Sequence, residues 1–316
     1  MTNGKIDVHQ HIVPPAYSAW LRSKGLAEAG GREIPAWSAD EALALMDKFG
    51  IARAVLSVST PGVHLDPGVV RDPAARAKAR EVNEFAAQVA RDHPDRLGFF
   101  ATLVLPDVDG SLEELTYSLD ELGAAGVVLL ASNHGEYLGA PEHEPLFAEL
   151  ERRRAVVFIH PNQLFGPRVE GIPPFAADFL LDTTRAAFRL VRNDVVRSYP
   201  NVRMILSHAG GFVPYASHRL AITITAETGR SPIEVLEDFR SFYFDTALSG
   251  SPAALPSLFA FAKPGHVLFG SDWPYAPEIG VAFFTSQLDA YDAIGADGHA
   301  ALDHRNAEAL FGAAVR

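Results

Sequence analysis

The chain has 316 residues, of which 48% are hydrophobic and 21% are charged, and this composition is ordinary for a globular protein. Its 27 lysines and arginines against 39 aspartates and glutamates leave a formal net charge of −12, which repels phosphate backbones and argues against nucleic acid as a partner. The absence of cysteine excludes disulfides and thiolate ligands, so any bound metal must depend on nitrogen and oxygen ligands.

Short, strongly apolar segments recur along the chain. Runs such as VVLLA and AVVFIH are almost continuously apolar, which is typical of strands buried on both faces of a parallel sheet. The segments that predict strands are Lys5–Ile12, Ala52–Thr60, Leu97–Pro106, Gly126–Ser132, Ala155–Asn162, Val202–Gly211, Phe242–Leu248 and His266–Tyr275.

Longer segments with helical spacing of apolar residues lie between these strands. In the first of them, Leu43, Met46 and Phe49 recur at intervals that place them on one helix face. The segments that predict helices are Ala39–Phe49, Asp72–His93, Gly110–Leu122, Glu144–Arg153, Thr183–Ser198, Pro232–Phe239, Ala253–Phe261, Val281–Ile294 and Asn306–Phe311.

Eight strands that alternate with helices predict an α/β fold, namely a distorted (β/α)8 TIM barrel with loop insertions at the catalytic face. A doubly wound sheet is the alternative, but the chain has neither a G-x-G-x-x-G after an early strand nor a phosphate-loop motif. No long linker divides the sequence, so residues 1–316 are expected to form a single domain. Gly30–Trp37 and Phe165–Pro174 are rich in glycine and proline, and we expect both to be loops that cover the barrel mouth.

The sequence also bears on where the protein resides. The N-terminal segment MTNGKIDVHQHI has no basic region followed by an apolar stretch, so no signal peptide is expected. No uninterrupted apolar run reaches the length of about 18 residues that a membrane span requires. Together with the absence of cysteine, these features predict a cytoplasmic protein without a membrane partner.

Two histidines stand two residues apart on the first predicted strand. Because strand side chains alternate, His9 and His11 point to one face and can bind one cation. They lie at the carboxyl end of the strand, where barrel enzymes carry their active sites. Asp7 shares this face one layer below, and we expect it to be structural.

Three further ionisable residues end predicted strands in the same way. His160 ends AVVFIH, His208 ends VRMILSH and Asp272 ends HVLFGSD, and each is followed by residues that turn the chain into a loop. Ionisable groups at the ends of buried strands carry a desolvation cost unless they find partners. A shared cation offsets that cost because it accepts neutral imidazoles and a carboxylate.

The order of these groups resembles the amidohydrolase superfamily, whose pattern is H-x-H on strand one, histidines after strands five and six, and an aspartate after strand eight. The local sequences DVHQHIVPP, EPLFAELERRRAVVFIHPN, NVRMILSHAGGFVP, LFGSDWPY and HRNAEALFG are similar to its decarboxylase branch. That branch includes aminocarboxymuconate-semialdehyde decarboxylase, gamma-resorcylate decarboxylase and 6-methylsalicylate decarboxylase. The likeness covers nearly the whole chain, in order.

The resemblance implies roles for these residues. His9, His11, His160 and Asp272 match the metal ligands of the family, and His208 matches its catalytic histidine, with Asp272 as a second catalytic group. No lysine ends strand four, where binuclear relatives carry one, and this departure favours one divalent metal ion over two. Zinc is the expected metal because three neutral nitrogens and a carboxylate suit it, and manganese is the alternative.

Other residues are expected around this centre. Asp245 follows strand seven and is expected to orient His208 or a water molecule. Gly210 and Gly211 are expected to let the backbone pass close to the site. For a substrate carboxylate, Arg168 and Arg185 are the candidate cations. The residues predicted to line a pocket for a flat, apolar substrate are Trp273, Tyr275, Phe212, His134 and Phe165.

The function expected from the resemblance is metal-dependent, non-oxidative decarboxylation of an aromatic or related unsaturated carboxylic acid, such as an ortho-hydroxybenzoate. The alternative is hydrolysis of a lactone, amide or ester in the same site, because the ligand set does not separate a lyase from a hydrolase. A non-catalytic binding barrel is a third hypothesis, but it predicts a damaged set of ligands, and the set is complete. The expected partner is a small carboxylic acid, and a homodimer is expected from the relatives.

Overall fold

The computed structural model describes residues 4–164, 166 and 169–312. Its central sheet contains eight parallel strands whose order in space follows their order in the chain. The strands of this sheet are β1 (Lys5–His11), β4 (Ile51–Ser57), β5 (Leu97–Thr102), β6 (Gly126–Leu130), β9 (Val156–His160), β10 (Arg203–Leu206), β11 (Tyr243–Asp245) and β12 (Val267–Leu268).

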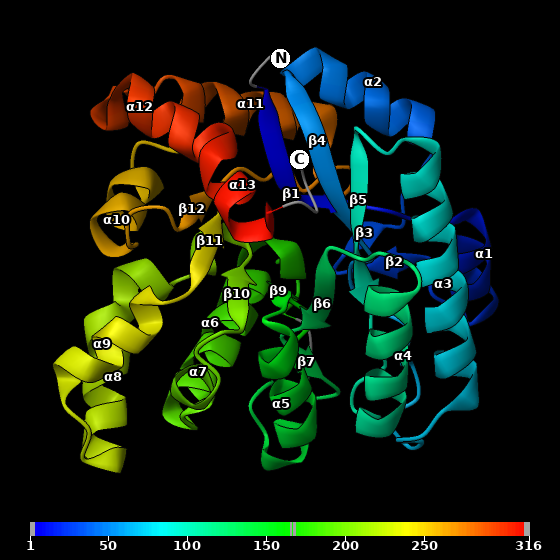
Figure 1. The fold of residues 1–316 in the computed structure, drawn as a ribbon, viewed down its shortest axis with the longest axis horizontal. Helices are drawn as coiled ribbons and strands as arrows, with labels where there is room; N and C mark the ends of the chain where they lie inside the picture. Colours follow the sequence, from blue (N-terminus) through cyan, green and yellow to red (C-terminus); the bar gives the residue numbers. More distant parts are fainter. Residues whose placement is uncertain (1–3, 165, 167–168, 313–316) are drawn as a thin grey trace.

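The first and last strands of this sheet come together, so the sheet closes into a barrel. The amide of Val8 donates to the carbonyl of Phe269 at 3.0 Å, and the amide of Asp272 donates to the carbonyl of His9 at 2.7 Å. Figure 1 shows the strands arranged around a common centre with helices outside them. The prediction of a (β/α)8 TIM barrel is therefore confirmed, and each of its eight strands corresponds to a predicted segment.

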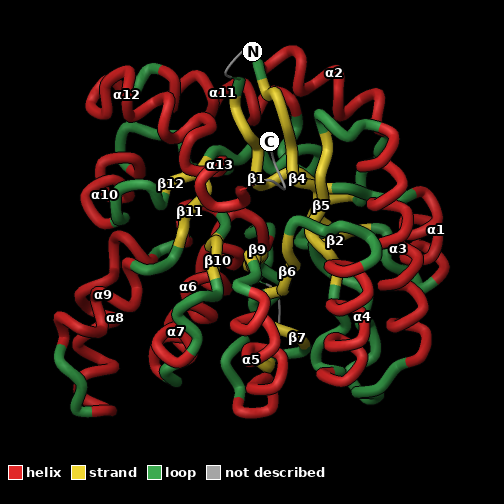
Figure 2. Tube along the Cα trace, viewed as in Figure 1, coloured by secondary structure: helices red, strands yellow, loops and turns green. Residues whose placement is uncertain are grey.

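Helices connect successive strands and cover the outside of the barrel (Figure 2). Three of them begin with a side-chain cap: the hydroxyl of Ser38 and the carboxylates of Asp72 and Asp107 accept hydrogen bonds from the first turns of α2, α3 and α4. The α-helices are α1 (Pro15–Ser23), α2 (Ala39–Phe49), α3 (Pro73–Asp92), α4 (Val108–Asp120), α5 (Glu144–Arg153), α6 (Pro174–Arg192), α7 (Val195–Ser198), α8 (Val213–Thr228), α9 (Pro232–Arg240), α10 (Ala254–Phe261), α11 (Glu278–Asp289), α12 (Gly295–Ala300) and α13 (Asn306–Phe311).

Short elements complete the chain. Two antiparallel hairpins join β2 to β3 and β7 to β8. The short elements are the strands β2 (Glu28–Ala29), β3 (Arg32–Glu33), β7 (Ser132–Asn133) and β8 (Glu136–Tyr137), the 3-10 helices η1 (Pro141–His143), η2 (His208–Gly210) and η3 (Asp292–Ile294), and the π-helical turn η4 (Ala301–Arg305). Among the described residues, no helix combines the length and apolar character needed to cross a membrane.

Several predicted boundaries were wrong. The helix predicted at Thr183–Ser198 begins nine residues earlier at Pro174, and it is interrupted at Asp194, whose left-handed backbone separates α6 from α7. Helix α8 was not predicted, because β-branched residues such as Ile222, Thr223 and Ile224 favour strands in isolation. The expected loop at Gly30–Trp37 contains β3.

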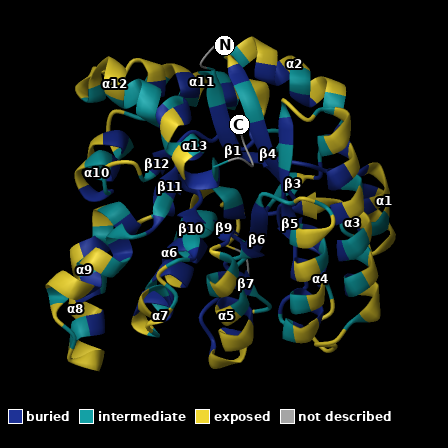
Figure 3. Ribbon diagram, viewed as in Figure 1, coloured by how far each residue is buried: buried dark blue, intermediate teal, exposed yellow. Residues whose placement is uncertain are grey.

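The hydrophobic core has an inner and an outer part. Side chains from the strands fill the barrel interior, where Leu310 and Phe311 of α13 pack against them from one end. A second and larger cluster packs the outside of the strands against the helices. Figure 3 shows the buried strands at the centre and the exposed residues on the outer helices. This packing leaves the other end of the barrel, where the strands finish, for the polar residues.

Candidate metal centre and active site

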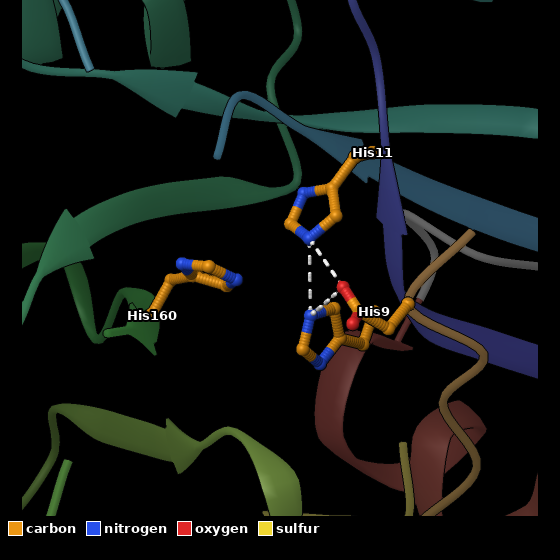
Figure 4. Close-up of side chains that lie close together, drawn as sticks. His9, His11 and His160 are labelled. Carbon is orange, nitrogen blue, oxygen red and sulfur yellow. Dashed lines mark hydrogen bonds and ion pairs between the residues drawn. The ribbon is translucent and has the colours of Figure 1, made fainter. Parts of the chain in front are cut away.

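Four ionisable residues, from β1, β9 and the turn after β12, converge at the carboxyl end of the barrel. One ligand atom from each of His9, His11, His160 and Asp272 lies within 4.8 Å of the corresponding atoms of the other three. All four residues are buried. Figure 4 shows the labelled side chains of His9, His11 and His160 directed toward a common space. The structure thus brings together the four residues that the sequence analysis singled out as a ligand set.

The local structure explains why these side chains meet. His9 and His11 lie on the same side of β1, and His160 is the last residue of β9. Asp272 follows β12 in a turn whose amide bonds to His9, although the sequence predicted that this strand continues to Tyr275. The strand ends at Leu268, and Asp272 lies four residues further along the chain with a left-handed backbone of φ +61°.

The nearest ligand atoms are in direct contact. The Nε2 atoms of His9 and His11 are 3.1 Å apart, and they lie 3.2 and 2.9 Å from Oδ1 of Asp272. Ligand atoms about 2.0–2.1 Å from a tetrahedral zinc ion lie roughly 3.3 Å from one another, so these spacings match a shared cation.

Each of the three histidines uses its other ring nitrogen to hold its orientation. Nδ1 of His9 donates to Oδ2 of Asp245 at 2.8 Å, and Nδ1 of His11 lies 3.1 Å from the carbonyl of Ser57. Nδ1 of His160 lies 2.8 Å from the carbonyl of Pro161. Because Nδ1 is the donor in each ring, the neutral tautomer leaves the Nε2 lone pair for a cation. The donor set therefore fits one divalent metal ion.

The electrostatics of the site also favour a cation. Burial opposes charge on His9, but the carboxylates of Asp245 and Asp272 outweigh it and raise the pKa of His9 to about 10. Burial lowers the pKa of His11 and holds that of His160 well below its usual value, which favours the neutral form of both rings. Burial also acts against charge on Asp272, but hydrogen bonds with the surrounding histidines hold the pKa of its carboxyl well below the usual range. A metal ion can take the place of the proton that these carboxylates attract.

His208 lies beside this cluster. Its Nε2 atom is 3.6 Å from Oδ2 of Asp272, and Nδ1 is buried without a hydrogen-bond partner among the described residues. The backbone of His208 is left-handed, with φ +53°, and it begins η2 after β10 has ended at Leu206. The predicted strand to Gly211 is therefore too long. Strained backbone of this kind concentrates at functional sites.

Gly210 and Gly211, which were predicted to let the backbone pass close to the site, allow close approach to two neighbouring elements. Gly210 and Gly211 both have positive φ. A Cβ atom on Gly211 would lie 2.2 Å from the carbonyl oxygen of Leu180, and one on Gly210 would lie 2.8 Å from the ring of Phe244. Only glycine allows the backbone to pass this close to α6 and β11.

Asp245 connects the ligand cluster to the His208 turn. Its Oδ2 atom accepts from Nδ1 of His9, and its Oδ1 atom accepts from the backbone amides of His208 at 2.9 Å and Ala247 at 3.0 Å. The sequence analysis expected this residue to orient His208 or a water. In the structure it holds the backbone of His208 and the imidazole of His9.

A cavity of about 340 Å³ opens above the cluster. His160, His208 and Asp272 form part of its wall, and most of the remaining wall is apolar. Of the predicted pocket residues, Tyr275 lines this cavity and also meets the ring of His11 edge-to-face, with centroids 5.4 Å apart. A cavity of this size and character suits one substituted aromatic ring.

The other predicted pocket residues lie elsewhere. Trp273 packs against the hydrophobic core, and Phe212 precedes α8 with 38% of its surface exposed. His134 pairs with His64, since Nε2 of His134 lies 3.1 Å from Nδ1 of His64. These three side chains are not part of the described cavity wall. Phe165 lies outside the described residues, and the binding roles of all four stay predictions.

The structure changes which arginine is the candidate partner for a substrate carboxylate. Arg168 lies outside the described residues, and Arg185 lines a separate hollow beside Tyr137 and Leu220. Arg32, which was not predicted, lines the catalytic cavity instead, and its guanidinium stacks on the ring of Phe175 at 4.1 Å. Among residues 4–164, 166 and 169–312, this guanidinium makes no hydrogen bond or ion pair.

The wall that contains Arg32 is built from two distant segments. Gly30, at the turn between β2 and β3, accepts a hydrogen bond from the amide of Phe175 in α6 at 3.2 Å. Gly30 has φ +59°, and a Cβ atom there would lie 2.2 Å from the ring of Phe179. The prediction that this glycine-rich segment covers the mouth agrees with that contact. No local sequence signal connects it to Phe175 and Phe179, which the sequence analysis missed.

Comparison with known proteins places the chain in a class. Residues 6–313 match the family model described as amidohydrolase, and the chain belongs to this family. It is 39% identical over 296 residues to 6-methylsalicylic acid decarboxylase of Penicillium expansum, a match that covers 91% of this chain and 90% of the relative. It is 27% identical over 256 residues to gamma-resorcylate decarboxylase of Rhodococcus jostii, covering 75% and 77% of the two chains.

A solved structure supports the same assignment. The crystal structure of an amidohydrolase II is 29% identical and superposes with a TM-score of 0.89, covering 97% of this chain and 99% of that one. The resemblance to the decarboxylase branch of the amidohydrolase superfamily, inferred from the motifs, is therefore confirmed.

Proposed function

We propose that the protein is a metal-dependent, non-oxidative decarboxylase of a single-ring aromatic carboxylic acid, with an ortho-hydroxybenzoate as the expected class. The observation that carries this proposal is the cluster of three imidazoles and one carboxylate, which opens with His208 into a largely apolar cavity of about 340 Å³. The named relatives, which are decarboxylases of 6-methylsalicylic acid and gamma-resorcylate, support the reaction type and the substrate class.

The proposed metal ligands are His9, His11, His160 and Asp272. Zinc is the proposed ion, and manganese is the alternative because it tolerates the same nitrogen and oxygen ligands. When bound, the cation supplies positive charge that orients an anionic substrate and stabilises charge that develops on it. Asp245 and the carbonyls behind His11 and His160 keep the ligands in place before the metal arrives.

The reaction breaks the bond between the ring and its carboxylate, and carbon dioxide leaves. The electron pair of that bond stays on the ring carbon, which must then take up a proton. We propose that His208 and Asp272, 3.6 Å apart on the cavity wall, place and transfer this proton. Tyr275 and the apolar wall exclude water from the ring, and Arg32, which has no polar partner among the described residues, offers its charge to an anionic substituent.

A substrate panel tests the proposal. The metal-loaded protein is incubated separately with salicylate, 6-methylsalicylate, 2,6-dihydroxybenzoate and a set of aryl lactones and esters. We expect carbon dioxide release from at least one hydroxybenzoate and no lactone or ester cleavage. Hydrolysis without carbon dioxide release would replace the decarboxylase with the metal-dependent hydrolase that the same ligands permit. No turnover of any kind by metal-loaded protein would favour a binding barrel.

Other features of the organisation belong to the same proposal. We propose that residues 1–316 act as one catalytic domain, in the cytoplasm, and that the protein forms a homodimer. Size-exclusion chromatography with light scattering tests the dimer, because a mass near 34.1 kDa would identify a monomer instead.

A further inference from the structure

Asp272 holds a backbone conformation that its side chain disfavours. Its φ of +61° lies in the left-handed region, where residues other than glycine pay a steric cost. Such a conformation persists only when neighbouring contacts determine it. In this site the conformation matters, because it turns the carboxylate toward His9 and His11.

A second carboxylate, that of Asp7, lies below the cluster and makes four hydrogen bonds within the protein. Its Oδ1 atom accepts from the amides of His9 at 3.0 Å and Ser271 at 3.1 Å. Its Oδ2 atom accepts from the hydroxyl of Ser271 at 2.5 Å and from Nε2 of Gln10 at 3.2 Å. Asp7 therefore connects β1 to Ser271, the residue that precedes Asp272.

The side chain of Ser271 extends this hydrogen-bond network to the residue after Asp272. Its hydroxyl oxygen accepts from the amide of Trp273 at 3.2 Å while its proton goes to Asp7. The chain is thus tied on both sides of Asp272, at the amide before it and at the amide after it. Asp272 itself donates its amide to the carbonyl of His9 at 2.7 Å.

The location of these two residues separates them from the catalytic machinery. Asp7 is fully buried and Ser271 is 3% exposed. Neither side chain belongs to the group of convergent ligand atoms or to the wall of the catalytic cavity. An effect of Ser271 on the metal centre must therefore pass through the backbone of the Asp272 turn, whereas Asp7 also contacts the amide of the ligand His9.

We propose that Asp7 and Ser271 are positioning residues that hold Asp272 in its left-handed conformation and so set its distance from His9 and His11. We call the hydrogen bonds of Asp7 and Ser271 around Asp272 the clamp. The clamp preorganises the carboxylate of Asp272, because a turn without these bonds relaxes to a less strained backbone that directs the carboxylate elsewhere. This inference rests on the proposed metal centre and not on the choice of substrate.

The test measures metal affinity, which does not depend on turnover. Zinc dissociation constants are determined by competition with a fluorescent chelator for the wild-type protein and for Asp7→Asn, Ser271→Ala and Ser271→Thr. We expect dissociation constants about 10- to 100-fold higher for the first two variants, as for other partners that orient metal ligands. Ser271→Thr keeps the hydroxyl and is expected to recover most of the affinity.

A matched control separates positioning from general stability. Asp107 is similarly buried, caps α4 through the amide of Gly110 and pairs with Arg76, and among the described residues none of the four ligands is its hydrogen-bond partner. Asp107→Asn is expected to lower the melting temperature without changing zinc affinity. If Ser271→Ala folds and binds zinc within twofold of the wild-type protein, the clamp is structural only and the proposal is wrong.

The experiment stays decisive if one variant does not fold or if the protein is not a decarboxylase. If Asp7→Asn does not fold, Ser271→Ala and its threonine counterpart decide the question. If the substrate panel shows no decarboxylation, the affinities still test the clamp. In an active enzyme, the clamp variants measured at saturating zinc are expected to lower kcat with little change in KM, because Asp272 and not the substrate-binding wall is displaced.

Discussion

The floor and the wall of the cavity are built differently. We use floor for the cluster of His9, His11, His160 and Asp272, of which His160 and Asp272 reach the cavity surface. All four residues are buried, and each imidazole is fixed by a hydrogen bond from its Nδ1 atom. The wall around Arg32 comes from a two-residue strand and the start of α6, and its guanidinium has no polar partner among the described residues. Under the proposed function, the strand ends and the turns after them carry the chemistry, whereas the connecting segments select what enters.

Removing the metal is the strongest way to test the importance of the floor. Dialysis of the purified protein against a chelator is expected to abolish decarboxylation, because the four ligands then lack the charge that orients the substrate. Adding back zinc or manganese is expected to restore it, and the initial rates show which ion serves better. Full activity in protein shown by elemental analysis to be metal-free would contradict the proposed role of the floor.

Substitution of His208 tests the proton transfer at the boundary of floor and wall. His208→Ala is expected to lower kcat about 10²- to 10⁴-fold, the usual contribution of a general acid or base, while metal content is retained. His266→Ala is the matched control, since this histidine stacks on Tyr243 with ring centroids 4.0 Å apart and precedes β12. Equal losses in the two variants would remove His208 from the mechanism.

Substitution of Asp245 tests how strongly the hydrogen bond to His9 affects metal binding by the floor. Asp245→Asn is expected to raise the dissociation constant for zinc about 10- to 100-fold, because an amide that donates to Nδ1 of His9 disturbs the tautomer that binds metal. Isothermal titration with zinc checks this. An unchanged affinity with a normal melting temperature would show that the bond between Asp245 and His9 does not tune the site.

Arg32 in the wall is expected to have the smallest effect. Arg32→Ala removes a cation from a partly exposed position, so KM for an anionic substrate is expected to rise about tenfold with kcat nearly unchanged. Arg185→Ala is the matched control, because Arg185 lines a different hollow. A large loss of kcat in Arg32→Ala would mean that the wall takes part in chemistry, and the contrast with the floor would fail.

Much of the floor was predictable because its signals are local. An apolar run followed by a histidine or aspartate and then a turn marks His160, His208 and Asp272, and barrel topology brings such strand ends to one face. The same locality explains the boundary errors. His208 and Asp272 were assigned to strands, but their left-handed backbones place them in the turns that follow.

The sequence by itself determined the barrel, the family and the set of residues that meet at its carboxyl end, since periodicity and motif order survive without knowledge of packing. Only the tertiary structure decided that Arg32 and Phe175 share the cavity wall, that Asp245 holds His9 and the His208 backbone, and that Trp273 packs away from the cavity. Gly30 meets Phe175 and Phe179 across more than a hundred residues of chain, and such a contact depends on how whole elements pack. Side-chain direction and long-range packing arise from the assembled fold, so no short stretch of sequence encodes them.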